Sequence, residues 1–158
     1  MNEDKALRDH LIKLLMGRQA HVDLETALAD LPHELQGSKT EALSFTPWQL
    51  LEHMRIAQWD ILEFSRNPKH ISPEFPAEYW PTTESPPEEG SWNESVESFR
   101  SDLNAMVDLV SNPATDLFAA IPRGTGQTLL REALLVADHN AYHLGQLVLV
   151  RRGLDCWG

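Results

Sequence analysis

Two histidines with helical spacing are the residues of this sequence best placed to do chemistry. His139 and His143 stand four residues apart, and on a helix such residues share a face with Cβ atoms about 5–6 Å apart. Two imidazoles in this arrangement can chelate one metal ion. The adjoining row of the same predicted helix, from Leu130 to Val148 at three- and four-residue spacings, is wholly apolar. Both rings should therefore lie at or beside an interior face, where their nitrogens need partners. The alternative is a pair of hydrogen-bonded core histidines.

A third histidine lies on the apolar side of another predicted helix. His53 follows Leu50 and precedes Met54 in that helix's apolar stripe. Three neutral imidazoles suit zinc, nickel, cobalt or iron(II), and do not suit calcium or magnesium. Three protein ligands also leave coordination positions open, as at catalytic metal sites. We therefore predict a metal site at His53, His139 and His143, with zinc or nickel as the first candidates and iron or cobalt as the others.

Further polar residues could orient the three rings, as the outer partners of metal ligands commonly do. His21 lies near the apolar face of the first predicted helix and could also be a fourth ligand. The sequence does not choose among the candidates, and it predicts surface or loop positions for His10, His33 and His70. The candidates are His21, Asp60, Glu132, Asp138, Asn140, Tyr142 and Gln146.

Four long stretches have apolar residues at three- and four-residue spacings, which is the pattern of amphipathic helices. No alternating run typical of a strand and no Asn-Gly or Asp-Gly hairpin turn is present. Helices of this length bury their apolar faces best side by side. We therefore predict one all-α domain over residues 1–158, a four-helix bundle with a long crossover connection. The predicted helices cover residues 4–31, 46–67, 91–111 and 128–152.

Local signals mark where these helices begin. Thr46 can form a capping box with Gln49 across Pro47. Ser91 is predicted to cap the third helix in the same way, and Thr128 lies at the start of the fourth. The first helix contains Gly17, where it could break, because glycine costs about 1 kcal/mol relative to alanine in a helix.

The connection over residues 67–90 is much longer than the two to eight residues that usually join bundle helices. It contains six prolines, so it cannot be helical throughout. It also contains Phe75, Tyr79 and Trp80, which a merely solvated linker would not need. Two interpretations are open: a crossover strap whose aromatic residues anchor on the bundle, or a lid over one end of it.

Charge and cysteine content exclude several function classes. The chain has 13 basic and 24 acidic residues and a formal net charge of −11, which disfavours binding to nucleic acid or to an anionic membrane. No transmembrane stretch or secretory leader is evident. The single cysteine, Cys156, cannot form an intrachain disulfide and fits a reducing compartment. We expect a soluble cytoplasmic protein in which Cys156 is not a catalytic thiol.

The segments Trp48–His53 and Asp138–Gln146 resemble the two signature helices of the DinB-like superfamily, which also contains the bacillithiol transferases. The resemblance implies a four-helix bundle with a long crossover, often dimeric. It implies that the superfamily's three metal-binding histidines correspond to His53, His139 and His143. It also implies divalent-metal-dependent chemistry with a low-molecular-weight thiol, as in the thiol transferases and isomerases of the superfamily.

Three functions follow as alternatives. The first is a metal-dependent thiol S-transferase that acts on an unidentified small-molecule substrate. The second is a metal-dependent hydrolase whose nucleophile is metal-bound hydroxide. The third is a non-enzymatic bundle that dimerises or binds a partner, with the histidines serving packing.

Overall fold

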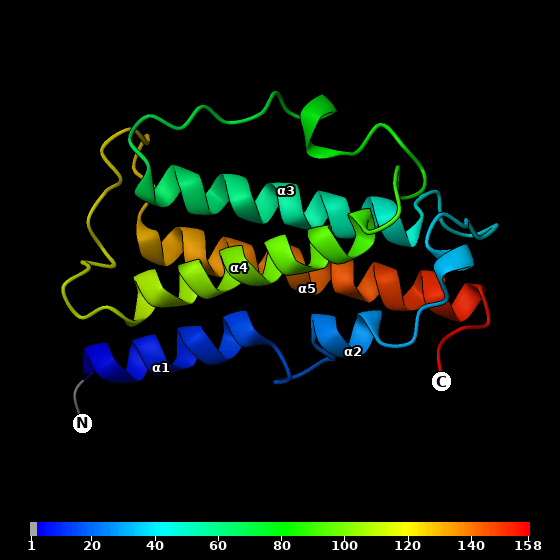
Figure 1. Ribbon diagram of the computed structural model, residues 1–158. Coiled ribbons are helices and arrows are strands. Elements are labelled where there is room, and N and C mark those ends of the chain that lie inside the picture. Colours follow the sequence, from blue (N-terminus) through cyan, green and yellow to red (C-terminus); the bar gives the residue numbers. More distant parts are fainter. Residues whose placement is uncertain (1–2) are drawn as a thin grey trace.

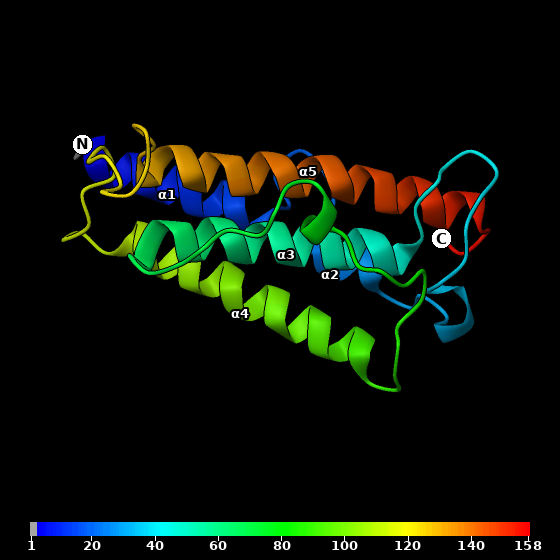
Figure 2. The same cartoon turned by 90° about the horizontal axis from the view of Figure 1, so that it is seen from above.

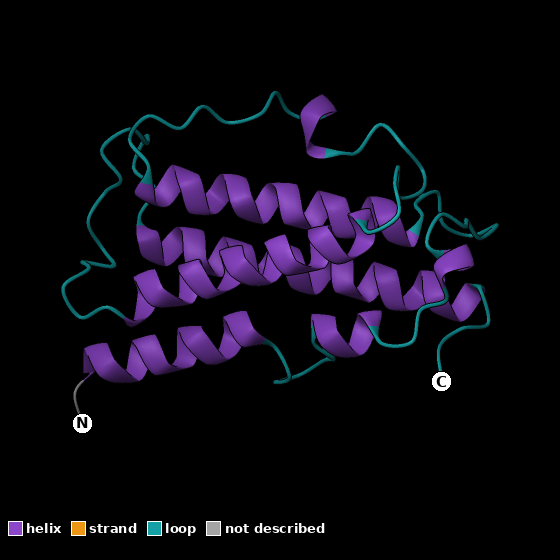
Figure 3. Cartoon of the chain, in the orientation of Figure 1, coloured by secondary structure: helices purple, strands orange, loops and turns teal. Residues whose placement is uncertain are grey.

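Helices form all the long elements of residues 3–158, which the computed structural model describes (Figure 1, Figure 3). Within these residues the one strand-like feature is an isolated bridge between Ala120 and Thr128. The predicted all-α bundle is therefore confirmed. The elements are α1 Glu3–Met16, α2 Leu24–Leu28, η1 His33–Leu35, α3 Pro47–Arg66, η2 Ala77–Tyr79, α4 Ser91–Ser111 and α5 Leu129–Gly153.

The helices α3, α4 and α5 lie beside one another, while α1 and α2 follow each other along the remaining side of the bundle (Figure 1). Together α1 and α2 occupy the place of one helix in a four-helix bundle. The interior between them contains fully buried apolar side chains, each contributing about 1.5–3 kcal/mol through removal from water. The largest of these are Phe99, Leu50, Leu51, Met54, Leu62, Met106, Leu117 and Leu147.

The prediction of one helix over residues 4–31 is wrong, because the chain leaves the helix at Gly17. Gly17 and Arg18 both have positive φ, at 75° and 59°, and a right-handed helix cannot continue through two such residues. A new helix, α2, starts after Asp23, whose side chain accepts from the backbone N–H of Thr26. The break leaves a cavity of about 250 Å³ between α1, α2, α4 and α5.

Two of the three predicted caps are confirmed. Thr46 accepts from the Gln49 backbone N–H, and the Gln49 side chain accepts from the Thr46 backbone N–H, which completes the capping box. Thr128 accepts from the backbone N–H of Arg131. The third cap is wrong: Gly90, with a φ of 98°, precedes α4, and Ser91 is its first helical residue.

Buried amides connect three helices in the middle of the bundle. The Gln58 side chain on α3 donates to the Phe99 carbonyl of α4 at 2.8 Å. Since a carbonyl can only accept, the amide nitrogen of Gln58 must face Phe99 and its oxygen must face Asn140 of α5. Asn140 donates to that oxygen at 2.9 Å. The two amides therefore link α4, α3 and α5.

The connection 67–90, which we call the strap, lies along the side of α3 (Figure 2). Near the start of α3, Thr46 donates to the Glu84 carbonyl and the Trp48 indole donates to Thr83. Near the end of α3, His70 of the strap contacts Asp60. The strap therefore runs along the bundle rather than over one of its ends, and Tyr79 and Trp80 contact the bundle as the first of the two interpretations expects, whereas Phe75 is 78% exposed and is not an anchor.

None of the helices in residues 3–158 has both the length and the apolar character that crossing a membrane requires.

Candidate metal centre

The three predicted ligands converge between α3 and α5. His53 Nε2 lies 3.1 Å from His143 Nε2 and 3.1 Å from His139 Nε2. One ring nitrogen from each histidine lies within 4.8 Å of the other two. His53 and His143 are buried and His139 is partly buried. These three imidazoles therefore form one cluster, which we call the histidine cluster, and it could hold a metal ion.

Hydrogen bonds fix which nitrogen of two rings carries the proton. His53 Nδ1 lies 2.7 Å from the backbone carbonyl of Tyr79, which can only accept, so Nδ1 is the protonated nitrogen. His143 Nδ1 lies 2.7 Å from the side-chain oxygen of Gln146. The amide nitrogen of Gln146 donates to the Tyr142 hydroxyl at 3.4 Å, which agrees with this orientation of the amide. Both rings therefore present an unprotonated Nε2 to the centre of the cluster.

Two unprotonated nitrogens 3.1 Å apart cannot hydrogen-bond to each other, because neither has a proton to donate. A shared cation removes this conflict. Nitrogens bonded at about 2.0–2.1 Å to one zinc ion lie roughly 2.9–3.4 Å apart for ligand angles near 90–110°. The two separations of 3.1 Å and the donor type of the histidine cluster fit a transition-metal ion.

The third ring lacks a comparable anchor. His139 Nδ1 is buried, and no hydrogen bond joins it to any of residues 3–158. Burial, followed by the nearby His143 and His53, lowers the pKa of His139 to about 4. Burial also lowers the pKa of His53 and of His143. The rings are therefore held in the neutral form that binds metal.

Aromatic side chains surround the cluster. The Trp80 ring stacks on His53 with a centroid distance of 3.8 Å and an interplanar angle of 2°. Phe45 stacks on the opposite side of Trp80 at 4.4 Å. Tyr142 contacts the edge of His143 at 4.9 Å and is largely exposed. Trp80 of the strap therefore covers one face of the ligand ring on α3.

Of the predicted orienting residues, Gln146 contacts a ligand nitrogen directly, and Tyr142 contacts both Gln146 and His143. Asp60 contacts none of the three rings; it accepts from the Tyr79 hydroxyl at 2.5 Å, and the Tyr79 carbonyl binds His53. Its connection to the cluster is therefore indirect.

The remaining candidates lie elsewhere. Asn140 donates to Gln58, Glu132 forms an ion pair with Arg131, and Asp138 is exposed. His21 is exposed, and its Nδ1 contacts the carbonyl of the next residue. It lines the cavity at the α1–α2 break, so it is neither a fourth ligand nor a partner of the three rings.

The contacts of the strap with the His53 ring were not predicted from the sequence. His70 is a loop residue, as predicted, yet its side chain is only 5% exposed and lies 2.7 Å from Asp60. Tyr79 and Trp80 were expected to anchor the strap, and they do so on a ligand ring. The Tyr79 contact is made by a backbone carbonyl, which carries no signal in the residue type.

Comparison with known protein families gave a match to the DinB superfamily over residues 17–147. The matched region contains all of α3, α4 and the three histidines. Neither the comparison with curated proteins nor that with solved structures gave a significant match. With most of its length matched, and with an all-helical bundle that fits the match, this chain belongs to the DinB superfamily.

Proposed function

We propose that this protein binds one divalent transition-metal ion through Nε2 of His53, His139 and His143. The observation that carries the proposal is the convergence of these nitrogens, two of them unprotonated because the other nitrogen of each ring donates a hydrogen bond. Imidazole donors favour zinc or nickel, with iron and cobalt as the alternatives.

We further propose that the protein is a thiol S-transferase that joins a low-molecular-weight thiol to an electrophilic small molecule. A bound divalent ion would supply the positive charge that stabilises the thiolate form of the thiol. The thiol chemistry is supported by the superfamily and by a set of three ligands, which leaves coordination positions free. A cytoplasmic location is supported by the lone Cys156, and a homodimer by resemblance alone.

The chain's own residues would orient the ligands and limit access of water. The Tyr79 carbonyl and the Gln146 amide hold the rings of His53 and His143, and such partners raise the basicity of a ligand imidazole. Trp80 excludes water from one face of His53. Tyr142 stands at the exposed side of the cluster, where a substrate would approach.

Metal analysis of protein purified without a histidine tag tests the site. We expect close to one equivalent of metal in the wild-type protein and in the His21→Ala variant, whose histidine is exposed and outside the cluster. We expect none in the variant with alanine at all three ligand positions. Metal that survives the triple substitution would contradict the proposed site.

Turnover assays then test the reaction. The metal-loaded protein is mixed with thiol and electrophile, and separately with ester, amide and phosphate substrates. Transfer that depends on both thiol and metal is the expected result. Hydrolysis that needs no thiol would contradict the proposed transferase activity and favour the metal-dependent hydrolase.

A further inference from the structure

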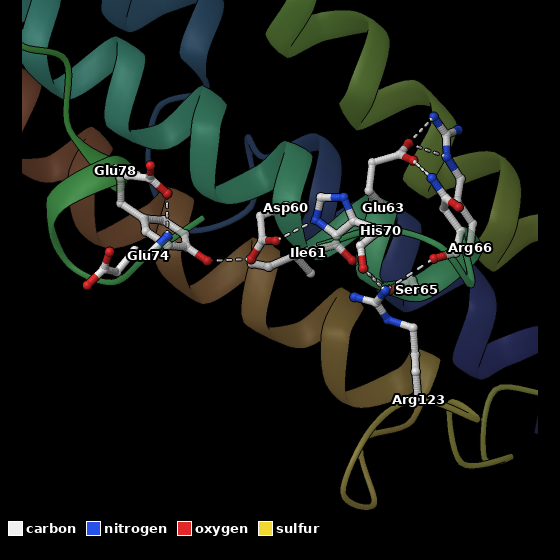
Figure 4. Close-up of polar contacts among 11 residues, drawn as sticks. Asp60, Ile61, Glu63, Ser65, Arg66, His70, Glu74, Glu78 and Arg123 are labelled. Carbon is white, nitrogen blue, oxygen red and sulfur yellow. Dashed lines mark hydrogen bonds and ion pairs between the residues drawn. The ribbon is translucent and has the colours of Figure 1, made fainter. Parts of the chain in front are cut away.

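A buried carboxylate on α3 contacts two separate points of the strap. Asp60 is 8% exposed. One of its oxygens accepts from His70 Nε2 at 2.7 Å, and the other accepts from the Tyr79 hydroxyl at 2.5 Å. Figure 4 shows Asp60 and His70 facing each other beside Arg123. Asp60 therefore fixes both the beginning and the middle of the strap against the same turn of α3.

Tyr79 connects Asp60 to His53, one of the ligands of the proposed metal site. Its hydroxyl is bound by Asp60, and its backbone carbonyl accepts from His53 Nδ1 at 2.7 Å. The next residue, Trp80, lies flat on the same imidazole ring. Both contacts that orient His53 from the strap thus come from two consecutive residues, and the first of these is held by Asp60.

Neighbouring groups stabilise the contacts that Asp60 makes with Tyr79 and His70. Burial and the Asp60 carboxylate raise the pKa of the Tyr79 hydroxyl, so the phenol remains protonated and donates. The guanidinium of Arg123 donates to the His70 carbonyl, and the Trp59 ring meets the His70 ring edge-on at 4.9 Å. The His70 end of the strap is therefore held by contacts that are independent of Tyr79.

We propose that Asp60 is a positioning residue for the metal centre, acting on His53 through Tyr79. Asp60 holds the Tyr79 side chain, and this places the Tyr79 carbonyl and the Trp80 ring where they orient His53. Partners of this kind typically change metal affinity by 10- to 100-fold when they are lost. By linkage, metal bound at His53 should in turn stabilise the packing of the strap against α3.

The test rests on the proposed function and measures zinc affinity by competition with a chromophoric chelator. Tyr79→Phe removes the hydroxyl and keeps the carbonyl, and we expect it to weaken zinc binding by about 10-fold or more. Asp60→Ala should weaken binding at least as much. Asp60→Asn keeps an acceptor for the Tyr79 hydroxyl and should retain most of the affinity. The double variant Asp60→Ala/Tyr79→Phe should bind zinc no more weakly than Asp60→Ala alone, because both changes remove the same hydrogen bond between Tyr79 and Asp60.

Thr83→Val is the matched control. It removes another hydrogen bond between the strap and α3, the one from Trp48, without involving Tyr79. We expect zinc affinity close to that of the wild type. An equal loss in Thr83→Val would mean that any loosening of the strap suffices, and would overturn the assignment to Asp60.

Trypsin cleavage after the exposed Lys69 of the strap provides a second measurement that does not depend on activity. Zinc should slow this cleavage in the wild type and much less in Tyr79→Phe. If the wild-type protein binds no metal, the proposed function and this inference both fail. If it binds metal, an unchanged affinity in Tyr79→Phe, or additive losses in the double variant, would overturn the inference alone.

Discussion

The metal-free protein should lose stability between pH 7.5 and 5.5 because the histidine cluster is held neutral. The folded-state pKa of His139 is lowered to about 4 from an ordinary 6.5. Between these values the unfolded chain binds more protons at this residue than the folded chain does. The free energy of unfolding therefore rises with pH across this window, and the stability is lost as the pH falls from 6.5 toward 4.

The size of the effect follows from the same values. When one histidine is protonated only in the unfolded chain, the free energy of unfolding falls by about 1.4 kcal/mol for each pH unit below the pKa of the unfolded state. After allowance for the partial exposure of His139, we expect a loss of about 1 kcal/mol at this residue between pH 7.5 and 5.5. The lowered pKa values of His53 and His143 act in the same direction.

Urea unfolding followed by circular dichroism, with a chelator present, measures this loss at three pH values. The His139→Ala variant is the comparison, since it lacks the titrating group while the other residues remain. Its stability should fall about 1 kcal/mol less than that of the wild type over the same range. Equal pH dependence in the two proteins would refute the reasoning.

Further substitutions test individual residues. Gln146→Met removes the acceptor for His143 Nδ1, and we expect zinc affinity to fall about 10- to 100-fold by chelator competition, while Gln146→Glu retains binding. Arg8→Met should lower the free energy of unfolding by about 2–4 kcal/mol in urea titrations, because buried Arg8 donates to three backbone carbonyls at the end of α4. Gly17→Ala should lower the melting temperature through about 1–2 kcal/mol of backbone strain, whereas Gly145→Ala, whose added Cβ meets open space, should raise it.

Helix starts could be predicted where their signals are local. The capping box at Thr46 and the N-cap at Thr128 each need only side-chain and backbone groups three residues apart. The division of α1 from α2 was harder to predict, because a single glycine within an apolar periodic run is compatible with either outcome. Here Arg18, a non-glycine residue, also has a positive φ. Periodicity alone carries no information about such a residue.

The grouping of the three histidines could be predicted because each lies on an apolar helix face, where an imidazole needs a partner. The residues that orient them divide into two groups. Gln146 lies three residues from His143 on the same helix, so spacing made it a candidate. The Tyr79 carbonyl reaches His53 across 26 residues of chain. Its position depends on the path of the strap, which sequence patterns do not reveal.

The two amides at the centre of the bundle bear on how the histidine cluster assembles. Gln58 lies five residues after His53 on α3, and Asn140 directly follows His139 on α5. Sliding one helix past the other by a turn, about 5.4 Å, would separate the Asn140 amide nitrogen from the Gln58 amide oxygen and leave these two atoms unpaired in the interior, at a cost of about 1–3 kcal/mol for each. The hydrogen bond between the amides thus fixes the axial position of α3 relative to α5, so the three imidazoles of the histidine cluster are in register without any bound ion.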